Sequence, residues 1–214
     1  FGFLAGSIGV AAAERLVLGI ERATAERLPL IAGPTSGGTR MQEGTVAFLQ
    51  MVKISAAIAA HKAAKLPYLV YLRNPTTGGV LASWGSLGHL TAAEPGALIG
   101  FLGPRVYEAL YNDAFPDGVQ TAENLMRRGL VDAVVNPELL RGIAITALDV
   151  LAAPRTGLPA VPNLPDEPIP DVPAWDSIVA SRRPERPGLR ALLPGTPHDV
   201  TPLQGTAEGE RDSA

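Results

Sequence analysis

The sequence contains no cysteine, few aromatic residues and no strong excess of charge of either sign. Of its 214 residues 5% are aromatic, and 18 Lys and Arg stand against 21 Asp and Glu, which gives a formal net charge of −3. The lack of cysteine excludes disulfides, thiolate metal ligands and a cysteine nucleophile from this stretch. The mixed charges give no electrostatic basis for nucleic acid or an anionic membrane as the main partner.

Long apolar runs and targeting segments are also missing. No window of 18 or more apolar residues is free of charge, so the sequence predicts no membrane-spanning helix. The opening stretch FGFLAGSIGV has no basic residue before it, and Glu14 and Arg15 soon interrupt its apolar character, unlike a secretory signal. Because the chain starts at Phe1 within such a stretch, we expect a fragment that begins inside a domain, from a cytoplasmic protein.

Proline divides the chain into two parts. Residues 154–214 hold 12 of the 20 prolines. The whole sequence is 46% hydrophobic, which is enough to build a buried core in the first part. We therefore expect a folded domain over residues 1–153 and a proline-rich, extended linker over residues 154–174. Residues 175–214 are expected to start a further region that is largely irregular, apart from a short helical piece broken at Pro184 and Pro187.

Hydrophobic periodicity predicts alternating helices and strands in residues 1–153. The expected helices are 10–27, 42–64, 105–111, 121–128 and 137–151, with a short one after residue 79, and the expected strands are 28–32, 68–73, 89–93, 97–101 and 132–135. The stripe expected to face the core in the second helix is Val46, Leu49, Val52 or Lys53, Ala56 and Ala57. Alternation of this kind predicts an α/β architecture with a mainly parallel sheet.

Two loops place adjacent glycines between the end of a strand and the start of a helix. They read Ser-Gly-Gly-Thr-Arg at residues 36–40 and Thr-Thr-Gly-Gly at residues 76–79. Ligands of parallel α/β sheets bind at the carboxyl ends of strands, where helix N-termini offer unpaired N–H groups. Two such loops can aim two N–H donors at one oxygen, as an oxyanion hole requires. The alternative, that these glycines only permit helix-starting turns, stays open.

Other candidate residues give weaker signals. His61 is expected on the solvated face of a helix, and His89 at a strand start is expected to be partly buried with a satisfied ring. Ser83, near His89 in sequence, is a poor candidate for a nucleophile. Arg105 opens a helix after Gly103-Pro104 and either binds an anionic group or simply starts the helix. A basic cluster in the proline-rich part is expected to be solvated or to form an interface; it consists of Arg182, Arg183, Arg186 and Arg190.

Four segments resemble the carboxyltransferase beta subunit of acetyl-CoA carboxylase. They are SGGTRMQEG at 36–44, LPYLVYLRNPTTGGVLAS at 66–83, AEPGALIGFLGPRV at 93–106 and FPDGVQTAENLMRRGLVDAVV at 115–135. Their order and spacing extend the resemblance over residues 1–150. It implies a crotonase-like fold, a βαβ superhelix, to which this chain adds a proline-rich C-terminal extension. It also implies a carboxyltransferase in fatty acid and malonyl-CoA biosynthesis, moving carboxylate from carboxybiotin to acetyl-CoA.

The resemblance also assigns roles to residues. Gly37, Gly38, Gly78 and Gly79 become the catalytic N–H donors, and the residues expected to bind substrate are Ser36, Arg40, Thr77, Gly103 and Arg105. A nitrogen of biotin is expected to take the substrate proton, so no His or Glu base is required. The family's four-cysteine zinc ribbon is missing from this stretch, so we expect neither a metal nor a bound cofactor here.

The tail carries a second, shorter resemblance. Residues 175–187 are similar to the opening of the carboxyltransferase alpha subunit, which predicts a beta–alpha fusion that stops just inside its alpha half. Partners implied are an acyl-CoA, the biotin carboxyl carrier protein, biotin carboxylase within an ATP-binding complex, the alpha-type half and further copies of the chain. No nucleic acid or membrane partner is expected.

Other functions are consistent with some of the same motifs. A hydratase or isomerase of the superfamily should carry a Glu in the turn after the second glycine loop, where this chain has Val80, Leu81, Ala82 and Ser83. A malonate decarboxylase subunit or a propionyl-CoA carboxyltransferase would run through the same enolate. Residues 1–214 alone are also consistent with a CoA-binding half that has no activity by itself.

Overall fold

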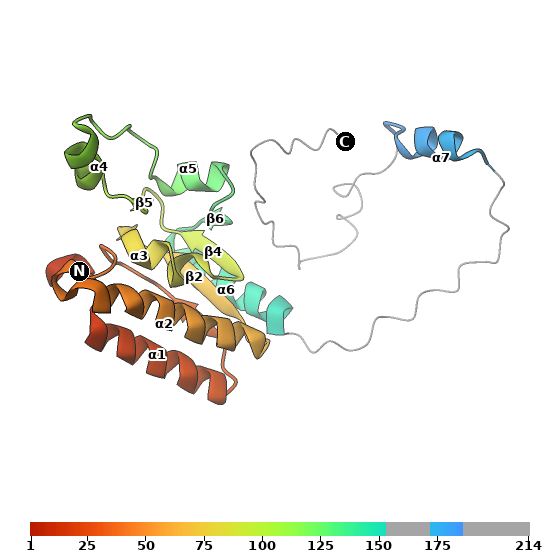
Figure 1. Cartoon of the computed structure of the whole chain (residues 1–214). Helices are drawn as coiled ribbons and strands as arrows, with labels where there is room; N and C mark the ends of the chain where they lie inside the picture. Colours follow the sequence, from red (N-terminus) through yellow and green to blue (C-terminus); the bar gives the residue numbers. More distant parts are fainter. Residues whose placement is uncertain (153–171, 186–214) are drawn as a thin grey trace.

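A computed structural model describes residues 1–152 and 172–185 of the chain (Figure 1), without the side chain of Arg105. Most of the predicted linker at 154–174 lies outside the described residues. The same holds for Arg186 and Arg190 of the predicted basic cluster and for the rest of the tail.

A parallel sheet forms the centre of the fold. Its strands are β1 (Leu30–Ala32), β2 (Tyr68–Leu72), β4 (Leu90–Ala93) and β6 (Ala133–Val134), in the order β1-β2-β4-β6. Each neighbouring pair is parallel, and Ala32 lies opposite Val70 while Leu72 lies opposite Ala93. Two shorter strands, β3 (Thr76–Thr77) and β5 (Ile99–Gly100), pair in parallel beside this sheet. The prediction of an α/β fold with a mainly parallel sheet is confirmed.

Helices alternate with these strands, as parallel connections require. They are α1 (Val10–Ala25), α2 (Gly44–Ala63), α3 (Gly78–Leu81), α4 (Pro104–Tyr111), α5 (Ala122–Arg127), α6 (Pro137–Ala152) and α7 (Ala174–Ser181). Short 3₁₀ turns occupy Leu4–Gly6, Met41–Glu43 and Trp84–Ser86. Helices α1 and α2 run side by side (Figure 1). The first helix is two residues shorter than predicted, because Arg27 has a left-handed φ of 56° that a helix cannot continue.

Strand β2 is the centre of the core. All five of its residues are buried, which is typical of a strand covered on both faces. Its two phenols nevertheless find acceptors, because the Tyr68 hydroxyl donates to the Trp84 carbonyl (2.8 Å) and the Tyr71 hydroxyl donates to the Val135 carbonyl (2.8 Å). Buried polar groups paired in this way add little cost to the core.

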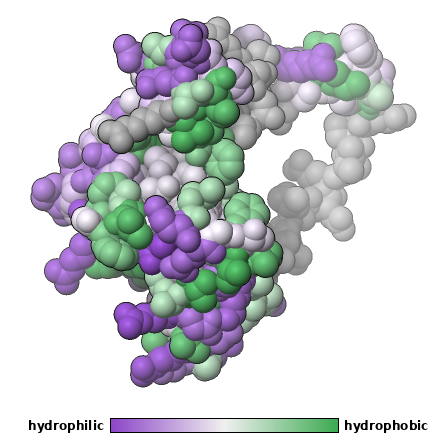
Figure 2. Space-filling view, turned by 60° about the vertical axis from the view of Figure 1, so that its left-hand side comes forward, coloured by the Kyte–Doolittle hydropathy of each residue, from purple (hydrophilic) through white to green (hydrophobic). Residues whose placement is uncertain are grey.

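Helix α2 faces the core with a different stripe from the one predicted. The buried residues are Ala47, Met51, Ile54, Ile58 and His61. Val46, Leu49 and Val52 of the predicted stripe are 56%, 57% and 62% exposed. Figure 2 shows that apolar side chains gather at several places on one face of the molecule. The prediction was wrong because both faces of α2 are apolar, so periodicity alone could not select one. Met41–Ala63 has the length and composition of a membrane span, with Lys53 inside it, and its inner face belongs to the core.

The histidines also differ from expectation. His61, predicted on a solvated face, is fully buried: its Nδ1 lies 2.9 Å from the Thr24 hydroxyl and its Nε2 3.2 Å from the Pro67 carbonyl. It therefore connects α2 to α1 and to the residue before β2. His89 precedes β4 and is exposed rather than partly buried, but its ring is satisfied as predicted, since Nδ1 accepts the N–H of Tyr68 (3.0 Å).

Candidate active site

The two glycine loops meet where β1 and β2 end. After β1 the chain enters residues 33–40, and after β2 it enters β3 and the start of α3. Ser36 and Thr76 form an isolated parallel bridge, in which the Ser36 N–H donates to the Pro75 carbonyl (2.8 Å) and the Thr77 N–H donates to the Ser36 carbonyl (2.9 Å). Because neighbouring parallel strands end at the same edge, the sheet itself brings these loops together.

The glycines of the two loops touch through their backbones. A Cβ added to Gly38 would lie 3.0 Å from the Thr77 carbonyl oxygen and 3.1 Å from the Gly79 nitrogen. A Cβ added to Gly78 would lie 3.3 Å from the Gly37 carbonyl oxygen. Gly38 and Gly78 also have φ values of 103° and 61°, which L side chains rarely adopt. Glycine is thus required at both positions for the loops to approach this closely.

The N–H groups of the two glycines in the first loop are already engaged. Gly37 donates to the Ala5 carbonyl (2.8 Å), and Gly38 donates to the Ser36 hydroxyl (3.0 Å). Of the four glycines predicted as donors, these two therefore bind the chain itself. For Gly37 to donate to a ligand, the Ala5 carbonyl would have to give way.

Donors that remain open lie at Gly79 and at Thr39, a residue that the sequence did not single out. Gly79 is the second residue of α3, and the N–H groups in the first turn of a helix have no acceptor within it. The N–H of Thr39 finds no acceptor in the described part of the chain. The two residues are in contact, since a Cβ on Gly79 would lie 2.3 Å from the Thr39 hydroxyl oxygen.

The buried hydroxyl groups of Ser36 and Thr76 hydrogen-bond to backbone carbonyls around the two loops. The Ser36 hydroxyl donates to the Gly6 carbonyl (2.8 Å) and accepts the Gly38 N–H, and with 2% of the residue exposed it has no room for a substrate. The hydroxyl of Thr76, also buried, lies 2.9 Å from the Pro34 carbonyl and 2.8 Å from the Arg73 carbonyl. Thr77 is partly exposed, and its hydroxyl lies 3.5 Å from the Ser36 carbonyl.

Arg40 is turned toward the protein. Its guanidinium donates to the Ser7 carbonyl (2.7 Å) and to the Glu43 carboxylate (3.1 Å), and it lies 5.1 Å from the centre of the Phe3 ring. The backbone N–H of Val10 donates to the same Glu43 carboxylate (2.7 Å) and holds its pKa below the usual range. These contacts occupy the side chain that the sequence assigned to substrate.

The remaining candidate residues either lie outside the two glycine loops or hydrogen-bond to the protein backbone. Gly103 precedes α4, and Arg105 is the second residue of that helix, its side chain lying outside the described residues. The Ser83 hydroxyl donates to the Gly79 carbonyl (2.5 Å), so it closes the turn of α3. Within residues 1–152 and 172–185 no group of three or more His, Asp or Glu side chains could hold a metal ion.

Sequence reasoning missed two carboxylates that shape the loops. Glu43 accepts the N–H of Val10, and Glu94, just after β4, accepts the N–H of Asn74 (3.0 Å) before the second glycine loop. Neither belongs to a pattern that marks catalysis. The position of Glu94 at the carboxyl end of a strand was the one signal that pointed to this edge of the sheet.

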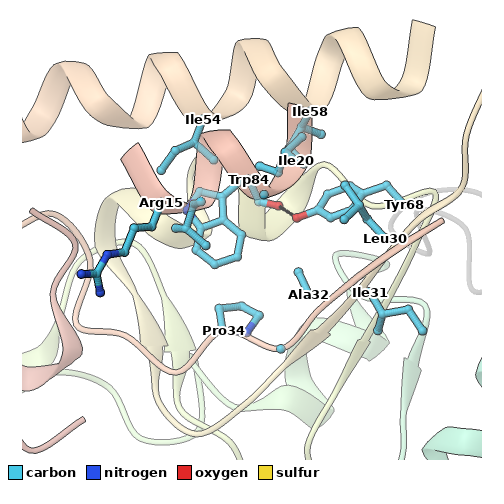
Figure 3. A pocket seen from close by; sticks show the side chains of 13 residues that line it. Arg15, Ile20, Leu30, Ile31, Ala32, Pro34, Ile54, Ile58, Tyr68 and Trp84 are labelled. Carbon is cyan, nitrogen blue, oxygen red and sulfur yellow. Dashed lines mark hydrogen bonds between the residues drawn. The ribbon is translucent and has the colours of Figure 1, made fainter. Parts of the chain in front are cut away.

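An apolar cavity of about 420 Å³ lies near the first loop, between α1, α2 and β1 (Figure 3). Trp84 and Tyr68 form part of its wall, and Pro34 links it to residues 35–40. The indole Nε1 of Trp84 is buried without a hydrogen-bond partner among the described residues. No glycine predicted as a donor lines this cavity.

Comparison with curated proteins places the sequence among carboxylase subunits. The chain is 69% identical over 210 residues to a protein of Mycobacterium tuberculosis named as a biotin-dependent acyl-coenzyme A carboxylase beta3 subunit, covering 98% of this chain and 42% of that protein. It is 46% identical over 175 residues to the acetyl-coenzyme A carboxylase carboxyl transferase subunit beta of Methylorubrum populi, covering 80% of this chain and 56% of that protein. The chain thus spans about half the length of these relatives or less.

Solved structures share the fold at low sequence identity. A malonate decarboxylase hetero-tetramer of Pseudomonas superposes with a TM-score of 0.60 at 20% identity, over 96% of this chain and 71% of that one. A transcarboxylase 12S structure superposes with a TM-score of 0.59 at 20% identity, over 67% of this chain and 28% of that one. These matches show that the α/β fold is shared with those proteins. A family profile described as the carboxyl transferase domain matches residues 1–201, and the chain therefore belongs to the carboxyl transferase domain family.

Proposed function

We propose that this chain is the acyl-CoA-binding part of the carboxyltransferase of a biotin-dependent acyl-CoA carboxylase. It would transfer carboxylate from carboxybiotin, carried by a biotin carboxyl carrier protein, to acetyl-CoA to give malonyl-CoA. The 69% identical relative supports the class of enzyme, and the 46% identical relative supports acetyl-CoA as the acyl substrate.

The observation that carries the proposal is the backbone junction of the two glycine loops. Gly79 lies in the first turn of α3 beside Thr39, and both residues are partly exposed to solvent. Within the described residues, their N–H groups are open donors at the carboxyl ends of β1 and β2. The first turn of α3 contains no acidic or basic residue, so the junction offers electrostatic stabilisation of an oxygen rather than proton transfer by a side chain.

Carboxyl transfer needs this kind of stabilisation. The bond between N1′ and the carboxylate of carboxybiotin breaks, and the freed nitrogen takes a proton from the methyl carbon of the acyl group. The enolate that results forms a new carbon–carbon bond with the released CO₂. Negative charge develops on the thioester oxygen during this step, and a well-placed N–H donor is typically worth roughly 10²–10³ in rate.

The proposed reaction also requires partners. The biotin carboxyl carrier protein and biotin carboxylase would supply the carboxylated substrate, and an alpha-type half would form the opposite wall of the site. The resemblance of residues 175–187 to that half supports a continuous beta–alpha polypeptide. We also propose that the protein works in the cytoplasm.

The test is consumption of malonyl-CoA by the whole polypeptide, with and without a free biotin derivative as carboxyl acceptor. We expect loss of malonyl-CoA only when biotin is present, because the reverse reaction needs a nitrogen to accept the carboxylate. Propionyl-CoA and acetyl-CoA are then compared in the forward direction to identify the acyl group.

The other outcomes contradict the proposal. Loss of malonyl-CoA without biotin would indicate a decarboxylase. No loss in either case, with CoA binding retained, would indicate a binding half or a different reaction of the superfamily.

A further inference from the structure

A run of hydrogen bonds joins the segment at residues 5–10 to the first glycine loop. The Gly37 N–H donates to the Ala5 carbonyl (2.8 Å), the Ser36 hydroxyl to the Gly6 carbonyl (2.8 Å), the Ile8 N–H to the Gly38 carbonyl (2.8 Å) and the Arg40 N–H to the Ile8 carbonyl (2.9 Å). The loop from 36 to 40 is therefore held along its length by this segment, in addition to the bridge between Ser36 and Thr76.

Two charged side chains fasten the end of this segment. Arg40 donates to the Ser7 carbonyl (2.7 Å) and to Glu43 (3.1 Å), while Glu43 accepts the Val10 N–H (2.7 Å). The side chains of Arg40 and Glu43 are only 18% and 33% exposed, so water competes weakly for these bonds. Glu43 also receives an N–H of the first turn of α1, where a carboxylate is favoured by the helix dipole.

Gly9 gives independent evidence that the carboxylate belongs there. A Cβ at Gly9 would lie 2.1 Å from Glu43 Oε1, and the other atoms close to it belong to the same carboxyl group. The φ of Gly9 is −101°, which any residue adopts, so glycine is not required by the backbone. Its missing side chain serves to admit Glu43.

We propose that Arg40 and Glu43 are positioning residues that hold residues 5–10 against the first glycine loop and so fix the direction of the Thr39 N–H that the loop offers to substrate. This inference rests on the proposed function. It gives Arg40 a role through the loop instead of contact with the acyl-CoA.

The physical need for such residues follows from the loop itself. Gly37 and Gly38 are adjacent, and glycine pairs populate many backbone conformations unless other bonds restrict them. An N–H donor contributes to catalysis only within a narrow range of distance and angle, and a misplacement of about 1 Å can cost on the order of 10²-fold in rate. Arginine suits this position because its planar fork donates in two directions at once.

The experiment compares three variants of the whole polypeptide with a matched control. Glu43→Gln leaves one acceptor oxygen for two donors, Arg40→Lys removes the fork, and Gly9→Ala expels the carboxylate without altering either charged residue. The control is Glu14→Gln, which breaks a different ion pair, between Glu14 of α1 and Lys53 of α2. We expect kcat to fall about ten- to hundredfold in the three variants with KM for acyl-CoA within about twofold of the unchanged protein, and no change in the control.

Hydrogen exchange supplies a readout that does not depend on activity. Amide exchange in peptides covering residues 33–41 should become faster in the three variants and stay the same in Glu14→Gln. Faster exchange in a protein that transfers no carboxylate would contradict the proposed function and leave the positioning role intact.

Two outcomes would overturn the positioning role. A rise in KM with unchanged kcat for Arg40→Lys would mean that Arg40 contacts the substrate. Unchanged exchange in Glu43→Gln and Gly9→Ala would mean that other contacts hold the loop.

Discussion

At the scale of single residues, Gly79 combines two functions that substitution can separate. Its N–H is an open donor, and its missing side chain leaves room for the hydroxyl of Thr39, 2.3 Å from where a Cβ would lie. Any substitution at Gly79 therefore displaces Thr39 as well. A background in which Thr39 is Ala removes that collision, because the atoms that then remain near the new carbon are Cγ of the flexible Met51 side chain, 3.3 Å away, and the Thr39 Cβ, 3.6 Å away.

In this background we compare Gly79→Ala with Gly79→Pro. Alanine keeps the N–H and proline lacks it, although proline is tolerated in the first turn of a helix. We expect Gly79→Pro/Thr39→Ala to lower kcat by roughly 10²–10³-fold relative to Gly79→Ala/Thr39→Ala, with similar acyl-CoA affinity. Steady-state kinetics and equilibrium binding of acyl-CoA measure the two quantities. Equal kcat values in the two double variants would show that this N–H does not stabilise the reacting oxygen.

Sequence alone gave the glycine pairs but not their separate roles. Adjacent glycines between strand and helix indicate a close approach of backbone, and the structure has that approach between Gly38 and Gly78. The Gly37 N–H is engaged by the Ala5 carbonyl, 32 positions away in the sequence, and the Gly38 N–H is engaged by the Ser36 hydroxyl, 2 positions away. These two partners decide which N–H groups stay open. Long-range pairings such as Ala5 with Gly37 leave no periodic signal, so the engaged state of these donors could not be predicted.

At the scale of elements, helix α2 presents two apolar faces, and substitutions on them should change the free energy of unfolding by different amounts. Ile54 on the inner face is fully buried, whereas Leu49 on the outer face is 57% exposed. Ile54→Ala should lower the free energy of unfolding by about 2–5 kcal/mol, because it removes buried methyl groups and leaves a cavity. Leu49→Ala should change it by about 0.5 kcal/mol or less.

Urea unfolding of residues 1–214, followed by circular dichroism, measures both variants. Similar losses for Ile54→Ala and Leu49→Ala would mean that the outer face is also packed in this chain. The expected contrast would confirm that the stripe through Met51, Ile54 and Ile58 faces the core.

The existence and order of most elements were predictable, whereas strand β3, which lies in the predicted second glycine loop, and the orientation of α2 were not. The strand at β2 is a continuous apolar run, and helix-starting glycines mark α3. Helix α2 has Phe48, Leu49 and Val52 on one side and Met51, Ile54 and Ile58 on the other, so a single period fits both sides. His61 was misplaced for the same reason, since it follows the inner stripe and its partner Thr24 comes from α1.

At the scale of the whole molecule, we expect the apolar outer face of α2 to be buried against another protein surface. Phe48, Leu49 and Val52 are each more than half exposed, and such clusters on soluble domains mark interaction surfaces. The chain spans 42% of the length of its 69% identical relative, so most of a polypeptide of that length lies outside residues 1–214. Helix α2 begins just after the 3₁₀ turn that follows the first glycine loop, so its N-terminal end lies near the candidate site. We expect the alpha-type half of the polypeptide to cover this face.

Chemical labelling of introduced cysteines tests this cover, because the 214 residues contain no cysteine of their own. Val52→Cys places a thiol on the outer face of α2, and Leu18→Cys places a control thiol on α1; the native residues are 62% and 56% exposed. In the whole polypeptide we expect maleimide to label Val52→Cys at least about tenfold more slowly than Leu18→Cys, after subtraction of labelling in the unsubstituted protein, because a covered thiol reacts only when its interface opens. Equal, fast labelling at both positions would mean that the outer face of α2 stays open to solvent and that the other half of the site docks elsewhere.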